Sequence, residues 1–203
     1  MKLLKGTIVI VCFFLLSYTA QGQASVGIGI KGGLNFAKLN GSQSLSADYS
    51  SRTGYHFGAY ALIKLGKIGI QPEVLYSKQG AKYAVNTSNF DANFDYINVP
   101  ILLKLYTVAG INIQVGPQFG FASGGQATTT IGNVSTTQNY KDLIKGSDVS
   151  IAMGLGWDLP FGLSLDARYN LGVSDNNNTG SSGQIKNQVI MVSAGYRLFK
   201  LGK

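Results

Sequence analysis

The segment Leu163-Ser-Leu-Asp-Ala-Arg-Tyr-Asn-Leu-Gly-Val173 decides the fold class, because apolar and polar residues alternate along it without interruption. Its apolar side chains fall on odd-numbered positions, whereas its polar and charged side chains fall on even-numbered ones. Alternation with a period of two predicts a β-strand with two unlike faces and excludes an amphipathic helix.

The same alternation recurs along the chain and predicts eight strands in all. It is clear in residues 97–106 and 111–119 and weaker elsewhere. The weaker strands are expected at 26–39, 54–65, 68–82, 147–159 and 188–199. Each is about long enough to cross a membrane at a tilt, for which roughly 9–11 residues suffice.

The composition excludes several protein classes. The chain has 203 residues, of which 27 are Gly, one is Cys, 45% are hydrophobic and 13% are charged. Disordered chains are less hydrophobic and more charged, disulfide scaffolds have many cysteines, and coiled coils are rich in Lys and Glu. The composition therefore favours one all-β domain. Because the basic residues behind the net charge of +8 are scattered, no nucleic-acid partner is expected.

The connections between the expected strands alternate between short and long. Short turns are expected at 66–67, 108–110 and 160–162. Long polar loops are expected at 40–53, 84–93, 124–146 and 175–186. Outer-membrane barrels have the same asymmetry, with short periplasmic turns and longer outside loops. The sequence therefore predicts an eight-stranded antiparallel up-and-down transmembrane β-barrel, with short periplasmic turns, long extracellular loops and both termini on the short-turn side.

The first residues are typical of a secretory signal. Lys2 and Lys5 precede an apolar run over 6–18, and Ala20 and Gly22 provide the small residues that a signal peptidase requires. We expect a signal peptide at 1–22, a barrel domain at 23–203, and export to the outer membrane of a Gram-negative cell. Cleavage would also remove Cys12, the single cysteine.

Charged residues on the polar faces of the strands indicate a polar interior. If the apolar faces contact lipid, the other parity collects charges of both signs in the lumen, where they can pair. The proposed lumen charge network consists of Lys31, Lys64, Glu73, Lys104, Asp158, Asp166, Arg168 and Arg197. Because the interior of an eight-stranded barrel is just wide enough for side chains to fill, we expect a plugged lumen.

Five sequence blocks resemble a known family. They lie, in order, at 29–36, 70–80, 96–104, 115–120 and 166–172. Together they are similar to the PorT-like outer-membrane β-barrel family of Bacteroidota. The resemblance implies an outer-membrane barrel that follows a signal peptide; most members have no assigned activity, and the name-giving member is tied to a protein secretion system. The chain departs from many outer-membrane barrels because Phe199 is followed by four further residues instead of ending the chain.

No catalytic, cofactor or metal site is expected. The segment Gly27–Gly32 matches G-x-G-x-x-G, but it lies within an expected strand, with no βαβ unit after it. His56 is the single histidine and, without a cysteine in the mature chain, cannot form a His/Cys metal cluster. No G-x-S-x-G motif is present, and no carboxylate is near His56 in its strand.

Three functional hypotheses follow. The first is a non-enzymatic outer-membrane barrel, structural, surface-exposed or accessory to envelope or secretion machinery. Its expected partners are outer-membrane lipids or lipopolysaccharide, the barrel assembly machinery, and a protein bound through loops 124–146 and 175–186. The second is a soluble lipocalin-like barrel with an apolar ligand inside. The third is a small outer-membrane barrel enzyme, whose candidate residues at the long-loop rim are Asp48, His56, Asp91, Asp95, Asp142, Asp148 and Asp175.

Overall fold

The computed structural model describes residues 24–41, 48–85, 88–131, 134–139, 146–173 and 185–202, so the expected signal peptide lies outside the described residues. The described part of the chain consists of strands and turns. The strands are β1 (Ala24–Gly41), β2 (Asp48–Leu65), β3 (Ile68–Val85), β4 (Ser88–Tyr106), β5 (Ile111–Ile131), β6 (Val134–Asn139), β7 (Ser147–Asp158), β8 (Leu163–Gly172) and β9 (Ile185–Leu201). Within these residues no helix is long and apolar enough to cross a membrane.

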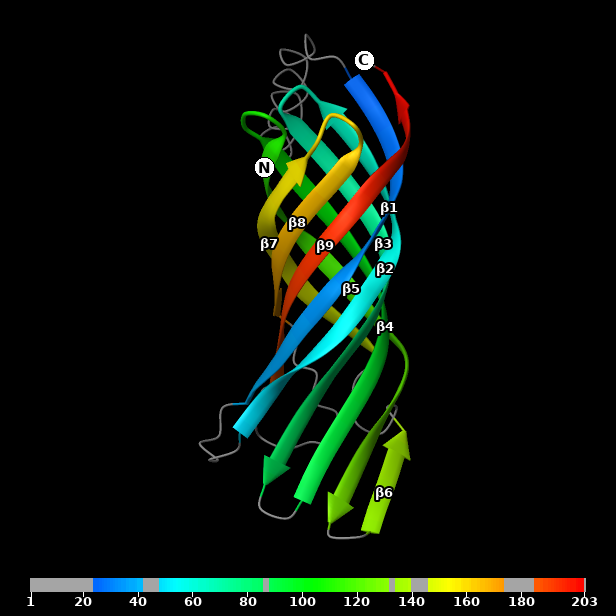
Figure 1. Cartoon of the computed structure of the whole chain (residues 1–203), viewed down its shortest axis with the longest axis vertical. Coiled ribbons are helices and arrows are strands. Elements are labelled where there is room, and N and C mark those ends of the chain that lie inside the picture. Colours follow the sequence, from blue (N-terminus) through cyan, green and yellow to red (C-terminus); the bar gives the residue numbers. More distant parts are fainter. Residues whose placement is uncertain are drawn as a thin grey trace, which may run out of the picture.

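Eight of these strands form a closed antiparallel barrel. From β1 to β5 each strand pairs with the next, β5 pairs with β7, and the ladder continues through β8 to β9. Strand β9 then pairs with β1 from Val26–Leu201 to Gly41–Ile185, which closes the barrel. Figure 1 shows the strands wrapping the barrel at a steep tilt. The predicted fold class is confirmed.

A ninth strand lies outside the barrel. Strand β6 pairs only with β5 among the described residues, so it extends the sheet without joining the closed wall. The expected strand count of eight is thus correct for the barrel and too low for the described chain.

The expected long loops are shorter than predicted, because the strands continue into them. Residues 40–41 and 48–53 belong to β1 and β2, and 185–186 belong to β9. The expected loop at 84–93 contains the end of β3 and the start of β4, and the expected loop at 124–146 contains the end of β5 and all of β6. Polar residues can extend a strand here because the neighbouring ladder satisfies their backbone groups without an apolar face.

The extended strands form a sheet that projects beyond the barrel. At the end opposite the short turns, β3, β4, β5 and β6 run well past the ends of β7 and β8 (Figure 1, bottom). β-branched Thr128, Thr129 and Thr130 in β5 favour a strand there, and they pair with Thr137, Thr136 and Ser135 of β6. We call the part of β3 to β6 beyond the barrel the projecting sheet.

The three short turns lie where the sequence predicts them. They connect β2 to β3 at 66–67, β4 to β5 at 107–110 and β7 to β8 at 159–162. Gly66, Gly110 and Gly162 have φ values of 59°, 83° and 98°, in the left-handed region that glycine adopts most readily. Strand β1 begins and β9 ends at this same end, as Val26 opposite Leu201 shows.

The outer surface of the barrel is apolar and its interior is polar. Exposed side chains include Ile28, Phe57, Leu155 and many other large hydrophobic residues from every barrel strand. The buried side chains are mostly polar or charged, and the buried hydrophobic cluster contains only Leu75, Val189 and Met191. This arrangement is the reverse of a lipocalin, so the soluble ligand-binding hypothesis is wrong.

Strand β9 contains a β-bulge near the short-turn end of the barrel. Ile28 of β1 lies opposite Phe199, but Gly29 lies opposite Arg197, so Leu198 is an extra residue in β9. Because the bulge inserts one residue, Arg197 and Lys200 both lie on the lumen side of β9, whereas simple alternation would place them on opposite faces.

We predict that Gly33→Ala destabilises the barrel, whereas Gly32→Ala does not. A Cβ at Gly33 would overlap the backbone oxygen of Val192, which cannot move without disturbing the β1–β9 ladder. At Gly32 the nearest atom, the backbone oxygen of His56, would be 3.3 Å away. Overpacking typically costs about 1–3 kcal/mol. Urea unfolding in detergent micelles, followed by the change in gel mobility on boiling, measures both variants. Equal midpoints for the two would contradict the prediction.

Candidate functional site in the barrel lumen

The candidate site is the set of polar side chains that fill the lumen. Strand alternation directs every second residue inward, and the inward positions of β1, β3, β5 and β8 carry charged residues or amides. Lys31, Glu73 and Arg168 are each 4% exposed or less. Because an unpaired charge is costly to bury, each of these side chains is expected to lie beside a group of opposite charge.

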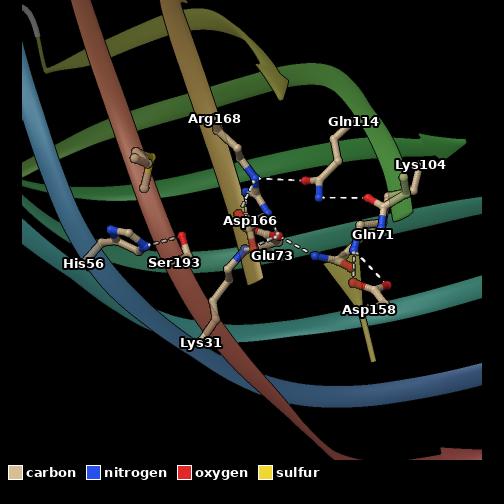
Figure 2. A network of polar contacts seen from close by, with 12 residues as sticks. Lys31, His56, Gln71, Glu73, Lys104, Gln114, Asp158, Asp166, Arg168 and Ser193 are labelled. Carbon is tan, nitrogen blue, oxygen red and sulfur yellow. Dashed lines mark hydrogen bonds and ion pairs between the residues drawn. The ribbon is translucent and has the colours of Figure 1, made fainter. Parts of the chain in front are cut away.

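Four of these residues form a compact ion-pair cluster, which we call the lumen quartet: Lys31, Glu73, Asp166 and Arg168. Arg168 donates two hydrogen bonds of 2.7 Å, from Nη1 to Glu73 Oε2 and from Nη2 to Glu73 Oε1. Lys31 Nζ lies 2.8 Å from Asp166 Oδ2 and 3.4 Å from Glu73 Oε1. Arg168 Nε also lies 3.0 Å from Asp166 Oδ1. Figure 2 shows the four side chains converging from three strands. The quartet contains two cations and two carboxylates, so its formal charge is zero.

Amide side chains add further hydrogen bonds to Glu73 and Arg168 of the quartet. Gln71 Nε2 donates to Glu73 Oε1 at 2.6 Å, and Arg168 Nε donates to Gln114 Oε1 at 3.0 Å. Gln114 Nε2 in turn donates to Asn112 Oδ1 at 3.0 Å. Sequence reasoning missed these amides because it considered only charged groups, although all three follow the inward parity of their strands.

A second ion pair lies nearer the short-turn end. Lys104 Nζ donates to both carboxylate oxygens of Asp158 at 3.1 Å, and Tyr106 Oη donates to Asp158 Oδ2 at 2.6 Å. The two other members of the expected network, Lys64 and Arg197, do not join either set of ion pairs. Among the described residues neither Lys64 nor Arg197 has an ion pair, and Lys64 Nζ lies 3.9 Å from the centre of the Tyr106 ring.

His56 lies in the lumen and joins a separate neutral cluster. Its Nδ1 is 2.6 Å from Asn35 Oδ1 and its Nε2 is 2.8 Å from Ser193 Oγ. Figure 2 shows His56 of β2 pointing toward Ser193 of β9 across β1. Gly33 of β1 pairs with His56 on one side and with Ser193 on the other, and its missing side chain leaves room for their contact.

The arrangement of Ser193, His56 and Asn35 has the order of nucleophile, base and orienting group that hydrolases use. Asn35 donates from Nδ2 to Ser77 Oγ at 2.8 Å, which fixes its orientation. However, all three are 4% exposed or less, so a substrate has no approach to Ser193 Oγ. Sequence reasoning looked for a carboxylate near His56 in its own strand, whereas the partners come from β1 and β9, whose register the sequence does not reveal.

Of the other residues named for an enzyme, the structure describes the side chains of Asp95 and Asp148. Asp95 lies 3.7 Å from Lys78 Nζ, and Asp148 is buried in the lumen wall opposite Gly120. Asp142 and Asp175 lie outside the described residues, and the side chains of Asp48 and Asp91 are likewise not described. Within the described chain, no group of three or more His, Cys, Asp or Glu side chains is placed to hold a metal ion.

Polar side chains also make contacts in the lumen between the quartet and the projecting sheet. Gln118 Nε2 donates to Ser150 Oγ at 3.3 Å, and Asn170 Nδ2 contacts the sulfur of Met191 at 2.9 Å. A cavity of about 10 Å³ lies beside Tyr96, Gln118 and Asn170, which is about the least volume that can hold one water molecule.

Comparisons with known proteins agree with this architecture. Residues 19–178 match the family model described as "Outer membrane protein beta-barrel domain". The solved structure of Neisserial surface protein A superimposes with a TM-score of 0.52 at 13% identity, over 86% of this chain and 99% of that one. Ail, the attachment invasion locus protein of Yersinia pestis, solved with the heparin analogue sucrose octasulfate, gives 0.52 at 16% identity, over 87% and 99%. A search of curated proteins finds no significant match to the chain.

We predict that Arg168→Met is strongly destabilising and that adding Glu73→Gln reverses part of the loss. Removing Arg168 alone leaves two buried carboxylates with only Lys31, and breaking a buried pair costs about 3–5 kcal/mol. The double variant keeps Lys31 and Asp166, so the site is again neutral. Urea unfolding in micelles gives the three free energies. Additive losses would show that the two residues do not stabilise each other.

Proposed function

The chain belongs to the outer membrane protein β-barrel domain family, and from this membership we propose that it acts in the outer membrane as a non-enzymatic barrel with a closed lumen. In this proposal the projecting sheet is the part that meets other molecules at the cell surface. Residues 1–22 would direct export as a signal peptide, and the barrel assembly machinery would insert the mature chain.

The apolar outer surface supports insertion into a bilayer. Large hydrophobic side chains are exposed around the barrel, from Ile28 on β1 to Leu155 on β7. A soluble monomer rarely exposes a continuous apolar surface of this extent. Outer-membrane lipids, including lipopolysaccharide in the outer leaflet, would therefore cover this surface.

The lumen quartet is the single observation that carries the closed-lumen proposal. It joins side chains of β1, β3 and β8 across the interior. A diffusing solute would have to separate these buried ion pairs, which is costly. The small cavity beside Tyr96 supports the same interpretation on the other side of the quartet.

The burial of Ser193 supports the non-enzymatic proposal. A hydrolase would need a substrate carbonyl within about 3–3.5 Å of the nucleophile, and Ser193 is enclosed by His56, Gly33 and the β9 backbone. The cluster is better explained as a neutral hydrogen-bonded contact between β1, β2 and β9.

The projecting sheet supports a role in surface contact. Its β5–β6 hairpin is held by side-chain hydrogen bonds between Thr128 and Thr137, at 3.1 Å, and between Thr130 and Ser135, at 3.0 Å. Every described side chain of β6 is exposed. Its partner would be a protein bound through the 124–146 and 175–186 regions. The five sequence blocks shared with PorT-like barrels of Bacteroidota support a more specific version, in which this partner belongs to envelope or secretion machinery.

We predict that the purified barrel forms no stable channel in a planar bilayer. The pairwise variant Glu73→Ala/Arg168→Ala opens space in the lumen while keeping its formal charge at zero, so it should conduct. Lys67→Ala, at an exposed turn outside the lumen, is the control and should stay closed. Stable conductance steps from the unmodified protein would refute the closed lumen.

A second prediction concerns orientation. An epitope inserted between Ile131 and Val134 of the projecting sheet should bind antibody on intact cells, because that sheet is proposed to lie outside. The same epitope inserted between Gly66 and Lys67 should bind only after the outer membrane is permeabilised. Both variants keep all the barrel strands. The reverse pattern would place the projecting sheet in the periplasm and remove the surface role.

A further inference from the structure

The short-turn end of the barrel contains a recess that the lumen network does not fill. Its volume is about 940 Å³, and its lining comes from β1, β2, β4, β7 and β9 and from the short turns. Tyr106, whose side chain is buried, lines it, and Trp157, whose side chain alternation places on the outer face of β7, lies at its edge. The recess is open to solvent at the end where β1 begins and β9 ends.

Three cationic side chains line this recess. Lys64 comes from β2, and Arg197 and Lys200 come from β9, where the bulge at Leu198 brings Lys200 to the same face as Arg197. Arg197 lies over Gly27, where a Cβ would clash with its side chain. No ion pair joins any of the three to another described residue.

The negative charge in the recess is already neutralised. Asp158 is the one carboxylate among the lining residues, and it accepts hydrogen bonds from Lys104 and Tyr106. Lys104 therefore compensates Asp158, and the other three cations remain without a counter-charge in the described chain. This excess of positive charge belongs to the recess, because the quartet deeper in the lumen has a formal charge of zero.

We propose that this recess binds the phosphate group of an organic phosphate. An arginine fork and two lysines suit an anion with several oxygens and more than one negative charge, which a phosphate provides and a single carboxylate does not. Tyr106 and Leu62 offer an apolar wall for the organic part of the ligand. The phosphate could belong to a lipid headgroup of the adjacent leaflet or to a soluble compound. The site depends only on the geometry of the mouth, so its test is independent of the surface role and the closed lumen.

Trp157 makes the site directly measurable, because it is the single tryptophan of the chain and lies at the edge of the recess. The folded barrel in a neutral detergent is titrated with pyrophosphate and with glycerol 3-phosphate, and Trp157 fluorescence is followed. We expect saturable binding of both. Sodium chloride at the same ionic strength should not reproduce the change. If it does, the effect is charge screening and the proposal fails.

Matched variants test the assigned residues. Lys64→Gln and Arg197→Gln each remove one charged donor from the recess and should weaken binding by about tenfold. Lys67→Gln removes the same charge from an exposed turn at the same end and should leave the affinity unchanged. The gel mobility of unboiled samples verifies that each variant folds. Equal affinities for all three variants would overturn the proposal.

Nanodiscs distinguish the two sources of phosphate. The barrel is placed in phosphatidylcholine discs and in discs that also contain phosphatidylglycerol, and the pyrophosphate titration is repeated. If anionic headgroups occupy the recess, phosphatidylglycerol weakens pyrophosphate binding in the unmodified protein but not in Arg197→Gln. Equal binding in the two disc types, with the variant effects retained, assigns the site to a soluble phosphate.

Discussion

The paired hydrogen bonds between Arg168 and Glu73 are the interaction on which the rest of the structure depends. A charged side chain on the outer wall of this barrel would face lipid, at a cost of about 2–4 kcal/mol for Arg or Lys at the bilayer midplane. Both residues therefore face inward, where only a partner of opposite charge makes their burial tolerable. Lys31 and Asp166 complete the neutral cluster, so the contact ties β1, β3 and β8 together across the lumen.

The quartet also restricts strand register. A slip of one residue in β8 would exchange its two faces, placing Asp166 and Arg168 in lipid and Leu165 and Ala167 in the polar lumen. The neutral His56 cluster adds a second restriction, because its contact with Ser193 exists only when Gly33 lies between them. Interior polar contacts thus do for this barrel what close packing of apolar side chains does for a soluble domain.

The sequence predicts which face of each strand points inward, but it does not predict the pairing registers or where the strands end. Alternation in 163–173 predicts the strand, its inward face and the short turn before it, because lipid and lumen impose opposite demands on adjacent residues. Segments 84–93 and 124–139 show no apolar alternation, so the sequence predicts loops there, although their described residues belong to β3, β4, β5 and β6. The contacts of His56 with Asn35 and Ser193 depend on the register of β1 with β2 and β9. Neither the composition nor the alternation of the sequence reveals that register. The bulge at Leu198 likewise cannot be predicted from alternation, because alternation assumes that the strand contains no extra residue.

The same balance between charge and burial explains where this molecule can meet other molecules. In the middle of the lumen the charges of the quartet neutralise one another. At the two ends water and mobile ions lower the cost of an unpaired charge, so Lys64, Arg197 and Lys200 can lie at one mouth without an ion pair to any other described residue. At the other end, backbone pairing alone extends β3 to β6 beyond the barrel. The closed barrel therefore separates the cationic recess at one end from the projecting sheet at the other.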